Sequence, residues 1–184
     1  MNRSQTDPFE GLPGHPMMWI LVGSELLVFG GALIAFSAAR IADPSGFQAA
    51  QDHLDRLAGL FNVMILVTSG LFAALAVEAM RRDAPDVARR HLAMAGLLGF
   101  VFLAAKGAEY ARHIADGFTI DSGAFFTLYY LITGFHALHV VLGIVILAIV
   151  GRWPTVANIE SGAVFWHMVD LVWLLVFPVL YLVR

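Results

Sequence analysis

The sequence contains no cysteine and little charge. The absence of cysteine excludes disulfide bonds, covalent c-type haem attachment, thiolate-bound iron–sulfur clusters and cysteine-ligated copper. Charged residues make up only 14% of the 184 residues and the net charge is −3, so no basic surface indicates a nucleic-acid partner. The sequence also shows no nucleophile–base triad, phosphate-binding glycine loop or long internal repeat. The sequence therefore gives no evidence for an enzyme that depends on any of these features.

Apolar residues are abundant instead. They make up 59% of the chain and give a mean hydropathy of +0.77, which is too apolar for a soluble domain. A helix needs roughly 20 apolar residues to cross a membrane, and five runs are long enough: residues 17–39, 57–80, 92–114, 125–150 and 161–183. The connections between them, such as Asp43 to Gly46, are short and hold turn residues. The sequence predicts an all-α integral membrane protein, with a polar segment at 1–16 and one five-helix bundle over 17–184.

Arginine distribution predicts the orientation of the bundle. Residues 1–16 lack a basic region and a small-residue cleavage site, so no removable signal peptide is expected. Six arginines fall on one side of the predicted membrane: Arg3, Arg81, Arg82, Arg89, Arg90 and Arg152. Because positively charged loops stay in the cytoplasm, we expect a cytoplasmic N-terminus. Five crossings then place the C-terminal Arg184 outside.

Ionisable residues inside the predicted spans form two layers. Counting depth at about 1.5 Å per residue gives an inner layer in the cytoplasmic half, consisting of Glu25, His139, His167 and Asp170. An outer polar cluster consists of Asn62, Lys106, Glu109 and His113, the last three at helical spacing on one run. Ionisable groups are costly at such depths, so both sets should face protein and have partners.

The residues alone leave the roles of the inner layer open. Glu25 either is a structural acid or takes a direct part in lipid or proton chemistry. His139, His167 and Asp170 either hold helices together or, as the alternative reading, the two histidines bind haem or a metal in a stand-alone membrane protein. The Glu-x-x-His spacing typical of di-iron helix bundles does not occur.

Several polar and aromatic side chains have an ordinary interfacial explanation. His113 and the neighbouring Arg112 lie near the outer end of their helix, where long or polar side chains reach towards water. The four tryptophans lie mostly near predicted helix ends and are expected to anchor the helices at the membrane surface. They are Trp19, Trp153, Trp166 and Trp173.

Each of the five apolar runs carries a polar motif. The motifs are Ser24-Glu25 in the first run, Asn62 with Thr68-Ser69 in the second, Lys106-Gly-Ala-Glu109-Tyr110 in the third, Gly134-Phe-His136-Ala-Leu-His139 in the fourth, and Trp166-His167-Met-Val-Asp170 in the fifth. In this order they resemble subunit III of the haem-copper oxidases, including cytochrome c oxidase subunit III. The resemblance covers essentially the whole hydrophobic part of the chain.

The chain also departs from that family's usual pattern. Longer members have seven helices, and this chain resembles the form without the first two, which make one wall of a lipid-holding cleft. Ala137 stands where glycine is usual and Phe165 where tyrosine is usual. Phe177-Pro178 resembles the short members associated with nitric oxide reductases, so the kind of partner enzyme stays open.

The resemblance implies a non-catalytic accessory subunit in the bacterial inner membrane. Such a subunit carries no cofactor, stabilises a catalytic subunit, binds phospholipid and supports proton uptake. Haem, with copper or non-haem iron, is expected in the partner. Glu25 matches the family's buried carboxylate near the lipid cleft, and His139, His167 and Asp170 match its polar residues between helices.

Overall fold

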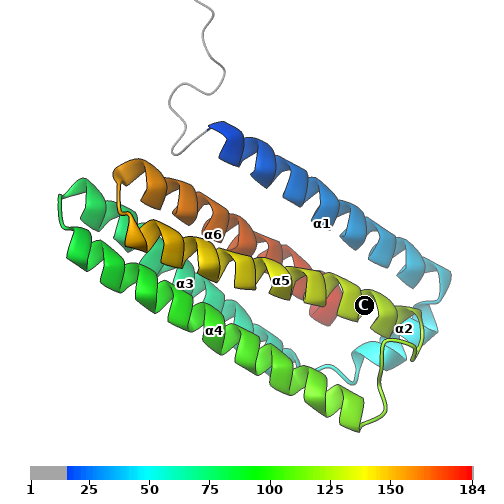
Figure 1. Cartoon of the computed structure of the whole chain (residues 1–184). Helices are drawn as coiled ribbons and strands as arrows, with labels where there is room; N and C mark the ends of the chain where they lie inside the picture. Colours follow the sequence, from blue (N-terminus) through cyan, green and yellow to red (C-terminus); the bar gives the residue numbers. More distant parts are fainter. Residues whose placement is uncertain (1–15, 184) are drawn as a thin grey trace, which may run out of the picture.

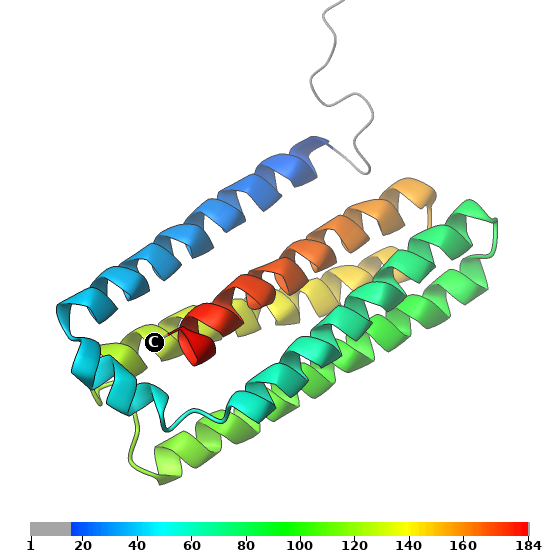
Figure 2. The same ribbon diagram turned by 180° about the vertical axis from the view of Figure 1, so that it is seen from behind.

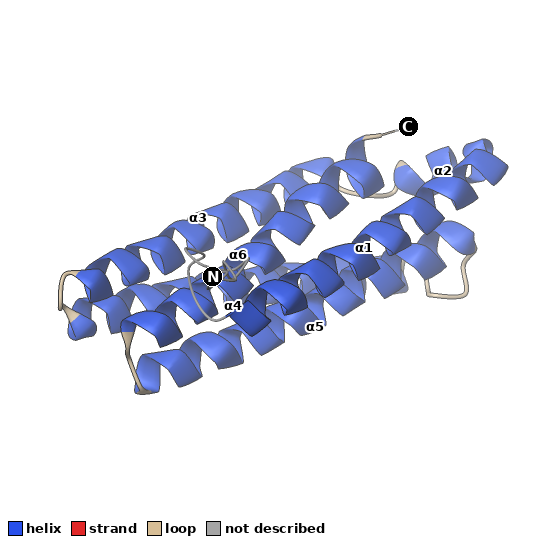
Figure 3. Ribbon diagram, turned by 90° about the horizontal axis from the view of Figure 1, so that it is seen from above, coloured by secondary structure: helices blue, strands red, loops and turns tan. Residues whose placement is uncertain are grey.

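The computed structural model describes residues 16–183, and the regular structure in this range is entirely helical (Figures 1 and 3). Most of the polar segment at 1–16, together with Arg3 and Arg184, lies outside the described residues. The elements are α1 (Pro16–Ala42), α2 (Pro44–Gln51), α3 (Arg56–Arg81), α4 (Pro85–Ala115), α5 (Ala124–Arg152), α6 (Val156–Phe177) and the π-helical turn η1 (Pro178–Leu182). Five helices, with η1 extending α6, are long and apolar enough to cross a membrane.

Two helix starts follow from proline and capping chemistry. α4 begins at Pro85, well before the expected residue 92, because proline suits the first position of a helix. The connection at Asp43 was expected to be a loop but begins α2. The Asp43 carboxylate accepts a hydrogen bond from the Gly46 amide at 3.0 Å, and Pro44 occupies the first turn. A side-chain cap followed by proline is a helix start, so the loop expectation was wrong here.

Helices α3 to α6 pack together, and α1 lies along α5 and α6 (Figures 1 and 2). α6 is central, since it contacts α1, α3 and α5. In its most apolar stretch 61% of the residues are buried, against 17% in α1. The first helix is therefore a peripheral element of the bundle.

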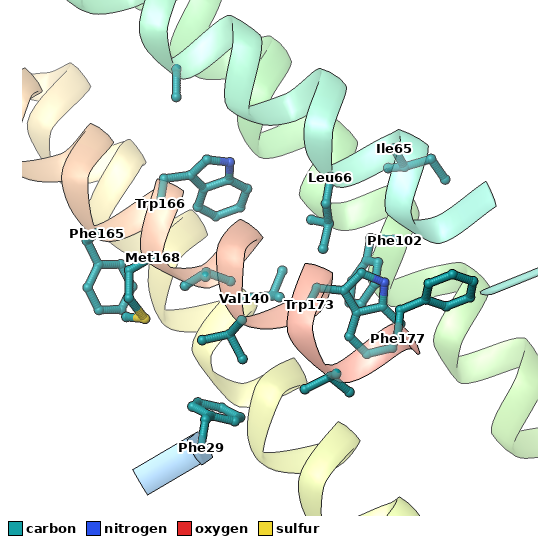
Figure 4. Close-up of a cluster of buried hydrophobic side chains, with 14 of the residues drawn as sticks. Phe29, Ile65, Leu66, Phe102, Val140, Phe165, Trp166, Met168, Trp173 and Phe177 are labelled. Carbon is teal, nitrogen blue, oxygen red and sulfur yellow. The ribbon is translucent and has the colours of Figure 1, made fainter. Parts of the chain in front are cut away.

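Trp166 and Trp173 lie in the core, so their expected role as interfacial anchors was wrong. Both are buried on α6 (Figure 4). A Cβ atom at Gly99 would lie 2.6 Å from Trp166 Cη2, and one at Gly143 would lie 2.7 Å from Cε3 and Cζ3. The indole therefore fits only because α4 and α5 carry glycine there. Its Nε1 donates to Ser69 Oγ at 3.0 Å, so the polar edge has a partner.

The C-terminal turn η1 is tied to the first two helices. Proline at position 178 has no amide hydrogen, and the helix widens there into a π-helical turn. Arg40 on α1 donates to the carbonyl oxygen of Val179. Gln51 on α2 donates to the carbonyls of Leu180 at 3.0 Å and Val183 at 3.1 Å. These bonds satisfy carbonyl groups that a helix end leaves free.

Candidate functional site

Glu25 and His139 link the peripheral helix α1 to α5. Glu25 Oε2 lies 3.1 Å from His139 Nε2, and the two side chains are 20% and 11% exposed. His139 Nδ1 lies 2.9 Å from the carbonyl oxygen of Phe135 one turn earlier, which orients the imidazole. Depth counting placed Glu25 and His139 at one level, and the structure brings them into contact.

An apolar groove runs between α1 and α5 beside this pair. Its volume is about 380 Å³. Two of its lining side chains, Phe29 and Phe135, also pack against the His139 ring, with centroids 5.4 and 4.5 Å away. The lining residues are Val28, Phe29, Ala32, Ala35, Leu128, Leu131, Ile132 and Phe135. The site thus combines an apolar groove with an ionisable pair, which lies beside the Phe29 and Phe135 rings that line the groove.

His167 and Asp170 form a second pair, which lies on a different helix interface. His167 Nδ1 is 3.8 Å from Asp170 Oδ2, and both side chains approach Gly70 of α3. A Cβ atom at position 70 would overlap Asp170 Oδ2, so glycine is needed for the carboxylate to lie there. Among residues 16–183, no hydrogen bond or ion pair connects this pair with Glu25 or His139. The inner layer is therefore two separate pairs.

This arrangement does not fit haem ligation by His139 and His167. A haem iron needs a free imidazole nitrogen from each histidine. The two nitrogens of His139 already lie against Phe135 O and Glu25 Oε2, while His167 lies against Asp170 and Gly70. Both His139 nitrogens are engaged and His167 lies on a different helix interface, so the geometry gives haem ligation by these two histidines no support.

A buried charge network centres on Lys106, the only lysine of the chain. Lys106 Nζ donates to Glu109 Oε2 at 3.0 Å, to Tyr129 Oη at 2.9 Å and to Tyr181 Oη at 2.7 Å. Both tyrosines also donate to Glu109 Oε1, at 2.7 and 2.6 Å. Lys106 and Glu109 are each only 2% exposed. The network connects α4, α5 and η1, and each ammonium hydrogen has a partner.

The sequence predicted Lys106 and Glu109 in one cluster but missed the two tyrosines. Asn62 and His113, the other predicted members, are buried but form no hydrogen bond with the network. The ring of His113 packs on Phe126 and Tyr129. Its expected position reaching towards water was therefore wrong, whereas the adjacent Arg112 is exposed.

A buried histidine that the sequence did not place in either layer belongs to the core. The His136 imidazole stacks on Trp173 with centroids 5.0 Å apart, and Phe102 contacts it edge-on at 5.6 Å. The only sign in the sequence that His136 is buried was its position near the middle of the fourth span, one helical turn before His139. The aromatic surroundings give it a packing role.

Comparison with known proteins covers nearly the whole membrane region. The sequence pattern of the family described as cytochrome c oxidase subunit III matches residues 14–183. A Mycobacterium leprae protein named probable cytochrome c oxidase subunit 3 is 28% identical over 91% of this chain and 86% of its own length. A Corynebacterium diphtheriae protein named cytochrome c oxidase subunit 3 is 30% identical, over 90% and 85%.

A fused relative is also similar. An Aeropyrum pernix protein named haem-copper oxidase subunit I+III is 30% identical over 90% of this chain, which spans 22% of that protein. In this relative, a segment similar to the present chain is part of a much longer polypeptide whose name includes subunit I.

Proposed function

Because the chain belongs to the cytochrome c oxidase subunit III family, we propose that it is a non-catalytic accessory subunit of a haem-copper oxidoreductase in the bacterial inner membrane. Its partner is a catalytic membrane subunit that carries haem, with copper or non-haem iron. The chain stabilises that subunit, binds phospholipid and supports proton uptake. The observation that carries the proposal is the match of one family over residues 14–183, which includes all five membrane-spanning helices.

The fused Aeropyrum relative supports the choice of partner. Its name joins subunits I and III in one polypeptide, so the two parts belong to one assembly in that protein. The names of the relatives favour an oxygen-reducing oxidase over a nitric oxide reductase. Phe177-Pro178 remains the sequence feature that favours the second kind of enzyme.

The proposed orientation has the N-terminus in the cytoplasm and the C-terminus outside. It is supported by the arginines in and around the α3–α4 connection, of which Arg89 lies at the start of α4 close to the end of α5. Its Nε donates to the Gly151 carbonyl at 3.1 Å. The basic side chains of the two connections therefore lie at one end of the bundle, as cytoplasmic retention requires.

Phospholipid binding is proposed at the groove between α1 and α5. An acyl chain suits the apolar lining, while Glu25 and His139 supply a polar contact near Phe29 and Phe135. Burial of apolar surface would supply most of the binding free energy, at roughly 25 cal/mol per Å².

We expect Glu25→Ala to lower the amount of tightly bound phospholipid and to shorten the active lifetime of the complex. The substitution removes the carboxylate that contacts His139 across the α1–α5 interface, so this wall of the groove is held less firmly. Lipid phosphorus per complex and activity during continuous turnover measure the two effects, while the haem absorption spectrum should not change. Ser24→Ala is the matched control, because the Ser24 hydroxyl donates to its own helix at Leu21 O. If Glu25→Ala instead prevented assembly of the complex, the main role of Glu25 would be structural.

The accessory role is tested by comparing complexes that contain or lack this chain. Both should begin turnover at similar rates, because the proposed reaction centre is in the partner. The complex without the chain should then lose activity faster, since its catalytic subunit lacks the supporting bundle and lipid. Identical decay curves would contradict the supporting role.

A further inference from the structure

The face of α6 that carries His167 is unsuited to contact with lipid tails. His167 lies 11 residues from the start of α6 at Val156, about 16 Å along the helix, which is near the middle of the span Val156–Leu182. Its side chain is nevertheless 48% exposed. A polar side chain exposed to hydrocarbon at this depth is costly and normally faces protein or a water-filled cavity.

Asp170 adds an unsatisfied carboxylate to the same place. The residue is 6% exposed, and neither Oδ1 nor Oδ2 accepts a hydrogen bond from the residues that the structure describes. The nearest imidazole nitrogen, His167 Nδ1, is 3.8 Å away, which is too far for a hydrogen bond. A buried carboxylate without a donor is destabilising, and both Asp170 oxygens are enclosed by the described part of the chain. The polar group that this face presents to a neighbour is therefore the exposed His167 imidazole.

The surface next to the pair has the shape of a helix contact. A groove of about 240 Å³ between α3 and α6 extends along His167. Small side chains, Ala74 on α3 and Ala163 on α6, line it, and such residues permit close approach of a further transmembrane helix. The charged residues of the groove already have partners: Arg81 pairs with Glu160 at 2.7 Å, and Glu78 pairs with Arg82 at 2.6 Å. One helical turn beyond His167, the apolar Leu171 is 44% exposed and continues the same face.

We propose that this α3–α6 face, centred on His167, is where a transmembrane helix of the catalytic subunit docks, with a hydrogen-bonding group opposite the exposed His167 imidazole. Lipid tails have no hydrogen-bonding group for this imidazole. The other exposed membrane surfaces of α4 and α5 carry apolar side chains such as Leu97 and Leu138, which lipid covers without cost. The inference rests on the proposed function and identifies the docking surface for it.

Photocrosslinking in the assembled complex tests the position of this surface. Benzoylphenylalanine in place of Leu171 should crosslink to the catalytic subunit, and the same residue in place of Leu97 on α4 should crosslink to lipid. Crosslinks from position 171 to lipid alone, while the catalytic subunit still co-purifies, would overturn the inference and leave the proposed function standing. Failure of any oxidoreductase chain to co-purify with the unmodified protein would overturn both.

Substitution of His167 tests whether a polar contact at this face helps to hold the catalytic subunit. His167→Leu should weaken retention of the catalytic subunit about threefold or more on dilution into detergent, given the typical strength of hydrogen bonds between membrane helices. His167→Gln, which keeps hydrogen-bonding atoms, should restore part of the retention. Thr68→Val is the matched control, because the exposed Thr68 hydroxyl already donates to Met64 O at 2.7 Å. Equal retention in His167→Leu and Thr68→Val would contradict a polar contact at this face.

Discussion

Replacing Glu109 with leucine is expected to lower the free energy of unfolding by about 3–5 kcal/mol, the usual cost of removing one partner from a buried ion pair. The substitution leaves the Lys106 ammonium buried with only the two tyrosine hydroxyls as acceptors. It also removes the oxygen that accepts hydrogen bonds from Tyr129 and Tyr181. Reversible unfolding in mixed detergent micelles, followed by circular dichroism, measures the change.

The double variant Lys106→Met with Glu109→Leu separates loss of pairing from loss of packing. Replacing both members of a buried ion pair by apolar residues of similar volume is often close to neutral. The double variant should therefore recover most of the stability that Glu109→Leu loses. A double variant as unstable as the sum of the two single variants would mean that Lys106 and Glu109 act independently, contrary to the 3.0 Å contact.

Trp166→Ala is the second substitution with a large expected effect. It should destabilise the bundle by about 3–5 kcal/mol, as truncation of large buried aromatic residues does. The indole fills the space that Gly99 and Gly143 leave between α4 and α5, and its Nε1 donates to the Ser69 hydroxyl. The same unfolding measurement detects the change.

Two controls accompany Trp166→Ala. Trp153 is 62% exposed at the end of α5, so Trp153→Ala should change stability by less than about 0.5 kcal/mol. Trp166→Phe keeps much of the apolar volume but has no indole donor, so its loss should be intermediate. Equal effects of Trp166→Ala and Trp153→Ala would contradict the buried position of Trp166.

The sequence predicted those features that depend on length and depth. Five apolar runs of sufficient length defined five membrane-spanning helices, and counting the rise per residue placed Glu25 level with His139. Depth does not determine the direction in which a side chain points around its helix. For this reason His167 and Asp170, at a similar predicted level, proved to face α3 at Gly70 and not the Glu25 pair.

The missed residues are aromatic, and they were missed because apolar helices give no amphipathic pattern. The apolar residues of α6 lie on every side of the helix, so periodicity could not identify Trp166 and Trp173 as core residues. The glycines at 99 and 143 on neighbouring helices were the available indication that a large side chain packs there. In the sequence, Tyr129 and Tyr181 are simply part of apolar runs. Only the three-dimensional structure shows that their hydroxyl groups accept hydrogen bonds from Lys106.

Purification of the tagged chain from its native membranes in mild detergent, followed by absorption spectroscopy of the complex and of the separated chain, tests the central claim most directly. The account predicts that a larger haem-bearing chain co-purifies and that the Soret band remains with that larger chain after separation. A Soret band that follows the separated 184-residue chain, and that disappears in His139→Ala or His167→Ala, would contradict the accessory role.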